Sequence, residues 1–169
     1  MISPEYCRTM VRYNSWQNDG LRRIVTEMDR AELEADRGAF FGSILGTLNH
    51  LLWADLVWLG RFDGGPRPEG SIADSPSHTR NRAEWTTQRF QTDGRMRVWA
   101  DKLTAVDLVG DLTYFSGATQ AEVTKPTALC VIHFFNHQIH HRGQIHAMLT
   151  AAGKTPGPTD LILMPTPQA

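Results

Sequence analysis

One segment of the chain, from about Ser43 to Phe62, is apolar on nearly every face when it is wound as a helix. It contains the run LNHLLWADLVWLGRF, in which few polar residues interrupt the apolar ones. A surface helix has a single apolar stripe, whereas a helix that is apolar all round is buried by neighbours on several sides. This segment therefore predicts a well-buried helix, packed against other elements on several sides.

Three further segments have the features of long helices, and each begins at a recognisable signal. The first starts with the capping hydroxyl of Ser3 followed by Pro4, and the second with Asn81 three residues before Glu84. The third starts with Pro126 alone. The last of them should stop at Gly153, because glycine favours the residue after a helix and prolines follow. The expected ranges are Ser3 to about Met28, Asn81 to about Leu103, and Pro126 to about Ala152.

A short hairpin is expected between the third and fourth long helices. The run DLTYF and the segment 119–123 flank Ser116-Gly117, which is typical of a two-stranded turn. The Pro- and Gly-rich stretch FDGGPRPEGSIADSPS reads as a long surface loop before the third helix. Four long helices with one small β-hairpin predict an all-α four-helix bundle, and 169 residues without an internal repeat predict one domain, 1–169.

Composition argues against several classes of partner. The net charge of −1 gives no electrostatic basis for binding nucleic acid, and no apolar run approaches the ~18 residues of a membrane span. The N-terminus lacks the apolar core of a signal peptide, and two cysteines, Cys7 and Cys130, are too few for a disulfide framework. These features predict a cytoplasmic protein with reduced cysteines. The arginines between residues 80 and 97 alternate with acids, which favours a solvated helix face.

Histidines are concentrated in the fourth helix, where four of the chain's seven lie in the segment HFFNHQIHH. His137 and His141 are four residues apart and so share one face, as do His133 and His137. On a helical wheel, His137 and His141 fall in a sector with large apolar residues. Since an unpaired buried polar group is costly, a metal shared by these two imidazoles would satisfy both. A neighbouring polar sector holds His133, Asn136, His140 and Gln144.

A third ligand must come from elsewhere, and His50 in the most apolar helix is the strongest candidate. His78 lies in the polar loop, and His146 points away from the pair. A lone buried histidine is usually bonded to a hydroxyl or carbonyl, which favours no metal for His50 taken alone. For His137 and His141, the spacing alone leaves metal and no metal about equally favoured. Small residues near His50 would leave room beside its ring; these are Gly46, Thr47 and Ala54.

The motif NHQIHHRGQIHAMLTAAG, together with LNHLLWAD about ninety residues earlier, resembles the DinB/YfiT-like family of metal-dependent enzymes. The early Tyr13-Asn14-x-Trp16 and the PTDLI tail extend the resemblance over nearly the whole chain. The resemblance implies that one histidine of the second helix and an H-x-x-x-H pair of the fourth bind one divalent metal, Ni²⁺ or Zn²⁺ first, Mn²⁺ or Fe²⁺ as alternatives. Carried over, the ligands are His50, His137 and His141.

The resemblance also implies the kind of chemistry. Three neutral histidines leave open metal positions, as in catalytic sites. The family implies transfer of a low-molecular-weight thiol (bacillithiol, mycothiol or a glutathione-like compound) to a small-molecule electrophile, or related isomerase or hydrolase chemistry, and a homodimer. Polar neighbours that could bond the ligands or a substrate, although each could be an ordinary surface residue, are Asn49, Asn136, His140 and Gln144.

Two other functions stay open from the sequence. One is a non-catalytic bundle whose metal is structural or adventitious. The other is a stress-related binding module that recruits a partner without chemistry. Arg142 could bind a carboxylate or pair with a nearby acid, and Tyr114 on the hairpin is more often a packing residue than a proton donor.

Overall fold

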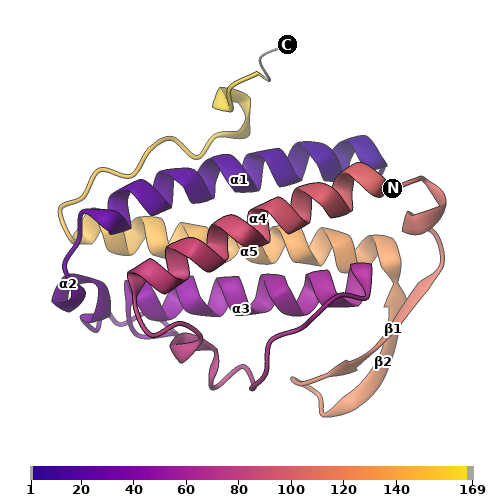
Figure 1. The fold of residues 1–169 in the computed structure, drawn as a ribbon, viewed down its shortest axis with the longest axis horizontal. Coiled ribbons are helices and arrows are strands. Elements are labelled where there is room, and N and C mark those ends of the chain that lie inside the picture. The colour runs from indigo at the N-terminus through magenta and orange to yellow at the C-terminus, as the bar shows by residue number, and fades with distance from the viewer. Residues whose placement is uncertain (1, 167–169) are drawn as a thin grey trace.

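The computed structural model describes residues 2–166 and shows a bundle of four long helices with one small hairpin (Figure 1). This confirms the predicted fold class, including the hairpin between the third and fourth long helices. The elements are α1 (Pro4–Thr26), α2 (Arg30–Glu34), α3 (Ile44–Asp63), α4 (Arg82–Lys102), β1 (Asp111–Ser116), β2 (Ala121–Pro126) and α5 (Thr127–Ala151), with 3-10 turns at Ser75–Ser77, Val106–Leu108 and Leu161–Leu163.

The helix starts follow the expected capping chemistry. Each cap side chain accepts a hydrogen bond from the backbone N–H three residues on: Ser3 from Tyr6, Ser43 from Gly46, and Asn81 from Glu84. The Glu84 carboxylate accepts from the N–H of Arg80 instead of Asn81, so the capping pair is only half reciprocal. Short helix α2 was not expected, although Asp29 and Glu32 form a complete capping box at its start.

The hairpin boundaries differ from the expected ones. The second strand covers Ala121–Pro126 and not 119–123, because residues 117–120 form the turn. Gln120 adopts a left-handed φ of 51° there. At the other end of α5, Gly153 has φ +73°, which confirms it as the residue that ends the helix.

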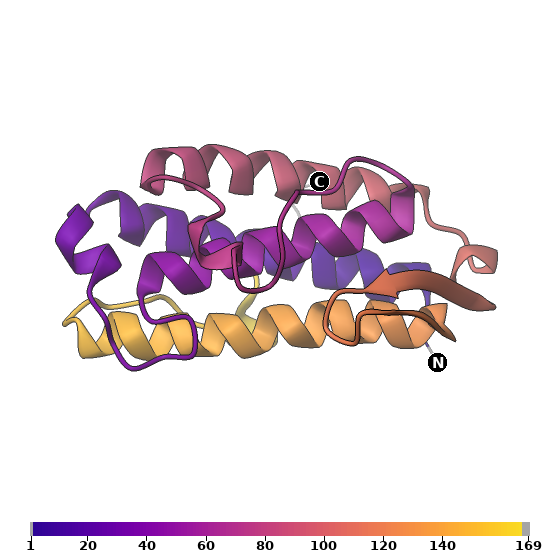
Figure 2. The ribbon, with the colours of Figure 1, turned by 90° about the horizontal axis from the view of Figure 1, so that it is seen from below.

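The long loop between α3 and α4 sets the topology. It returns along the length of the molecule, so α3 and α4 run parallel while α1 and α5 run the opposite way (Figures 1 and 2). Helix α3 packs against both α4 and α5, and α1 packs against α4. The hairpin lies at the end of the bundle where α3 stops and α5 begins (Figure 2). Fourteen of the 20 residues of α3 are buried, which confirms the prediction that this helix is well buried.

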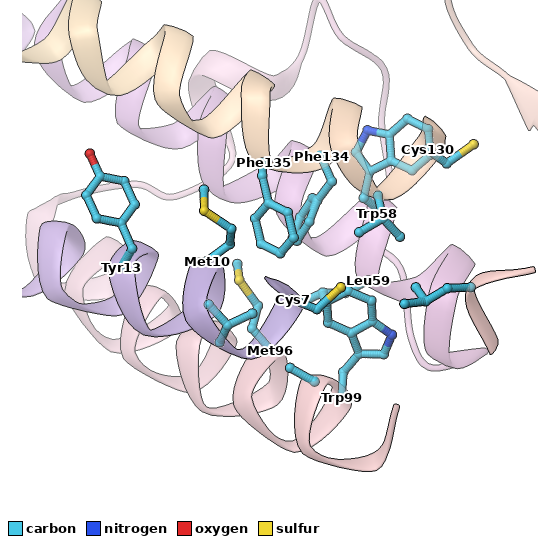
Figure 3. Close-up of a cluster of buried hydrophobic side chains, with 14 residues drawn as sticks. Cys7, Met10, Tyr13, Trp58, Leu59, Met96, Trp99, Cys130, Phe134 and Phe135 are labelled. Carbon is cyan, nitrogen blue, oxygen red and sulfur yellow. The ribbon is translucent and has the colours of Figure 1, made fainter. Parts of the chain in front are cut away.

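The apolar core consists of two clusters, one at each end of the bundle. The cluster nearer the hairpin is rich in aromatic and sulfur side chains, including Trp58, Met96 and Phe134 (Figure 3). The other is built mainly from aliphatic residues around Leu48 and Ile145. The two free cysteines, Cys7 and Cys130, lie in the first cluster, where burial raises the pKa of Cys7 to about 11.

A layer of buried polar side chains separates the two clusters, with members on all four long helices. At its centre Arg89 of α4 pairs with Asp55 of α3 at 2.6 Å and with Asp93 at 2.8 Å. The predicted solvated face of α4 is therefore wrong for Arg89 and Asp93, which are 1% and 6% exposed. Asn18 of α1 donates to Asp93, and Gln138 of α5 donates to Asp55. The layer ties the four helices together at mid-length.

No helix within residues 2–166 is long and apolar enough to cross a membrane.

Candidate metal centre

Three histidines meet between α3 and α5, beside the buried polar layer. His50 comes from the middle of α3, and His137 and His141 lie one turn apart on α5. The Nε2 atom of His137 is 3.3 Å from Nε2 of His50 and 3.1 Å from Nε2 of His141. These are the three side chains that the sequence selected as metal ligands, and the fold brings them to one point.

A hydrogen-bond partner fixes the protonation of the His50 ring. Ser75 Oγ lies 2.8 Å from His50 Nδ1 and donates its own proton to the carbonyl of Ile72 at 2.6 Å. Because a hydroxyl has one proton, Ser75 must accept at its contact with His50. The proton of His50 is therefore on Nδ1, and Nε2 presents its lone pair to the other two histidines.

The same logic applies to His141. Its Nδ1 lies 2.7 Å from Oε1 of Gln144, an amide oxygen that can only accept. The proton of His141 is therefore on Nδ1, and its Nε2 lone pair also faces His137. A single proton on His137 Nε2 could bond well to only one of its two neighbours, whereas a shared cation would satisfy all three nitrogens.

The electrostatics of the site keep the imidazoles neutral. Burial first, and the neighbouring His141 second, lower the pKa of His50 to about 4. Burial, and then the His141 and His50 rings, lower the pKa of His137 to about 3. Burial also lowers the pKa of His141. Neutral imidazoles are the form that binds metal.

The spacing of the nitrogens fits a metal ion. A tetrahedral zinc ion with bonds of 2.0–2.1 Å separates its ligand nitrogens by roughly 3.3 Å. The Nε2 atom of His137 lies 3.3 and 3.1 Å from those of His50 and His141, and ligand atoms of the three residues all lie within 4.8 Å of one another. The outer hydrogen bonds from Nδ1 to Ser75 and Gln144 match the way metal-binding histidines are usually oriented. The residues present therefore fit a divalent ion.

Two contributors to the site come from irregular loops and had no sequence signal. Ser75 lies in the loop after α3, and Phe41 in the loop before it. The Phe41 ring stacks on His50 with a centroid distance of 3.7 Å and also contacts His141 at 5.5 Å. Gly46 makes room for this loop: an added Cβ would lie 2.4 Å from the Phe41 carbonyl oxygen. The room that Gly46 leaves is thus filled by the loop of Phe41, whose ring lies against the His50 imidazole.

The predicted polar neighbours occupy different positions. Gln144 contacts His141 directly, and His140 contacts Gln144 at 3.3 Å. Asn49 is buried and holds the loop that carries Ser75, through bonds to Pro76 and Thr79. Asn136 is exposed, with no hydrogen bond to the three histidines in the described part of the chain.

Arg142 is buried in the polar layer and not at the metal centre. It donates to Asn14 Oδ1 and lies over the Tyr13 ring at 5.4 Å. Burial lowers its pKa to about 10. Among the described residues its partner is thus an amide and not the expected acid.

A cavity of about 360 Å³ opens beside His50 and His137. It runs between α3, α5 and the hairpin, and its walls are mostly apolar and aromatic. Its lining includes Trp53, Trp58, Arg61, Tyr114 and His133. A ligand in the cavity would reach the histidines from one side, which leaves room for an exchangeable position on a bound metal.

The fold and the site together define a helical bundle protein with a group of three histidines that could hold a metal ion beside a cavity. The sequence profile of the DinB family matches residues 1–168, so this chain belongs to the DinB family. No curated protein matches the chain significantly.

Proposed function

We propose that this protein is a divalent-metal-dependent enzyme whose metal is held by His50, His137 and His141. The observation that carries the proposal is the convergence of Nε2 atoms, two of which have their lone pairs fixed toward the shared point. Imidazole ligands favour late first-row ions, so Ni²⁺ and Zn²⁺ are preferred over Mn²⁺ and Fe²⁺.

We propose thiol transfer as the reaction, with a low-molecular-weight thiol of the bacillithiol, mycothiol or glutathione kind and a small electrophile as substrates. Family membership supports this choice, and thiol-dependent isomerisation or hydrolysis are the related alternatives. A divalent ion in such a site would lower the pKa of a thiol or water in its open position. The aromatic walls of Trp53, Trp58 and Tyr114 would hold the substrate and limit access of water.

Metal analysis of protein purified without a histidine tag tests the ligand set. The expected result is one equivalent of Ni²⁺ or Zn²⁺ per chain. Replacing any one of His50, His137 or His141 by Ala should abolish stoichiometric binding. The matched controls His78→Ala and His146→Ala should retain it. Full binding by His137→Ala would contradict the proposed site.

The reaction is tested with metal-loaded protein, a panel of the three thiols and a chromogenic electrophile. Transfer above the uncatalysed rate is expected for at least one thiol, and it should be lost in His137→Ala. A fully loaded protein without transfer, isomerase or hydrolase activity would instead favour the non-catalytic binding module.

We also propose a cytoplasmic homodimer. Trp16 and Trp53 are only half-buried and could contribute to an interface with a second copy, whereas Trp58 and Trp99 are buried in the core. Light scattering at micromolar concentration should give twice the chain mass of 19.0 kDa, and a monomer would exclude the dimer.

A further inference from the structure

Arg61 is one of the residues that line the cavity beside the candidate metal centre. Arg61 belongs to the last turn of α3, and its guanidinium carbon is 4.4 Å from the ring centroid of Trp58 and 4.1 Å from that of Tyr114. One of its nitrogens, Nη2, donates to the backbone carbonyl of Phe115 at 3.1 Å. The cation is therefore held between α3 and strand β1.

Arg61 has no counter-ion within residues 2–166: no carboxylate oxygen lies within 4.0 Å of it. Its Nε is buried without a hydrogen-bond partner. Arg95, at the same end of the bundle, differs because it binds both oxygens of Asp63 at 2.8 and 2.7 Å. Burial lowers the pKa of Arg61, because removing an unpaired cation from water disfavours its charged form.

The cavity joins Arg61 to the histidines. It is lined by His50 and His137 at one end and by Arg61, Tyr114 and Ser116 at the other. The guanidinium folds back over Trp58, which follows His50 by eight residues along α3. At 1.5 Å per residue this is about 12 Å along the helix axis. A ligand that reached both ends would be elongated, with an apolar middle against Trp53 and Val57.

We propose that this cavity binds a small organic acid whose carboxylate pairs with Arg61 while its other end reaches His50 and His137. The inference rests on the proposed metal-dependent function for the histidine end and on Arg61 for the acidic end. The planar guanidinium suits a carboxylate, which it can bind through two parallel hydrogen bonds. Arg61 would thus select charged substrates over neutral ones of the same length.

The first experiment uses zinc-loaded full-length protein and calorimetric titration with mercapto-octanoate and its neutral partner mercapto-octanol. Wild-type protein should bind the acid about tenfold more tightly than the alcohol, the scale of one charge-assisted hydrogen bond. Arg61→Gln should remove this preference without changing the affinity for the alcohol. Arg61→Lys should retain part of it, and Arg67→Gln, which removes an exposed charge on the following loop, should retain all of it.

The second experiment separates failure of this inference from failure of the metal proposal. Octanoate and octanol are titrated into metal-free protein while the indole resonances of Trp53 and Trp58 are followed by NMR. A preference for octanoate that depends on Arg61 supports the acid site even if no metal binds. Equal binding of acid and alcohol, or a preference that survives Arg61→Gln, overturns it. If Arg61 only fastens the hairpin, Arg61→Gln will lower the melting temperature and leave the acid-to-alcohol ratio unchanged.

Discussion

At the scale of single residues, the proton on each imidazole decides whether the site can bind metal. Ser75 and Gln144 each accept the Nδ1 proton of one histidine and so turn the Nε2 lone pair inward. Without such a partner, a histidine ring can rotate or change tautomer, and metal affinity falls about 10- to 100-fold. The orientation of the ligands is therefore set from outside the triad.

Ser75→Ala and Gln144→Ala should each weaken metal affinity by about 10- to 100-fold while preserving one site per chain. Competition with a chromogenic chelator measures the change. Ser77→Ala, an exposed serine in the same loop, is the matched control and should bind like wild type. Unchanged affinity in both test variants would show that the two hydrogen bonds do not orient the ligands.

The lowered pKa values of His50 and His137 predict how the stability of metal-free protein depends on pH. The unfolded chain takes up these protons near the ordinary value of 6.5, whereas the folded protein does so only near pH 4 and pH 3. Between these limits the unfolded state binds more protons, so the free energy of unfolding decreases as the pH is lowered from 6.5 toward 4. Above pH 6.5 both states are neutral, and the contribution is constant.

Urea unfolding of metal-free protein at a series of pH values from 7 to 4 checks this dependence. Glutamine does not titrate, so in His137→Gln the unfolded state should take up one proton fewer relative to the folded state. The free energy of unfolding should then fall less steeply as the pH is lowered. The same slope in wild type and variant would mean that His137 is protonated normally in the folded state.

At the scale of helices, the polar layer fixes how the four long helices align. Arg89 is 1% exposed and lies between the carboxylates of Asp55 and Asp93. Arg89→Met removes the cation and leaves both carboxylates buried, so the protein should lose about 3–5 kcal/mol of unfolding free energy. Arg97→Met on the exposed side of α4 should change it by less than about 0.5 kcal/mol. Equal midpoints in denaturant for the two variants would exclude this role.

Much of the helical architecture was predictable because caps and apolar patterns are local. Ser43 and Gly153 mark helix ends in the sequence, and the structure has them there. The polar layer was not predictable, because an arginine four residues from an aspartate has the same spacing on a solvated face as in a core. Only the packing of α3 and α1 against α4 decides that Arg89 and Asp93 are buried.

The candidate site was predictable in part for the same reason. The spacing of His137 and His141 is local to one helix, and the apolar setting of His50 pointed to a buried position. Ser75 and Phe41 reach the site from irregular loops, whose paths depend on tertiary contacts that no periodicity encodes. The environment of Arg61 likewise depends on a tertiary contact, because the ring of Tyr114 on the hairpin packs against its guanidinium.

At the scale of the whole molecule, a metal held by His50, His137 and His141 would connect α3 to α5 at mid-length. The same two helices already pack through both apolar clusters and the polar layer. The fold should therefore survive without metal, and the ion should add stability by binding only the folded state. This separates a catalytic metal from a structural one, because removal of a structural zinc unfolds a domain that depends on it.

Chelation should accordingly leave the helical circular dichroism signal intact at 25 °C and lower the melting temperature. Free metal at a hundred times its dissociation constant adds about 2.7 kcal/mol. For a chain of this size each kcal/mol shifts the melting temperature by about 2–4 °C, so the expected decrease is about 5–10 °C. His137→Ala should melt at the same temperature with and without chelator. Loss of helical signal on chelation would identify a structural metal and favour the non-catalytic bundle. The fold would then depend on the three bonds from the metal to the histidines, and the two apolar clusters would not be enough to stabilise it.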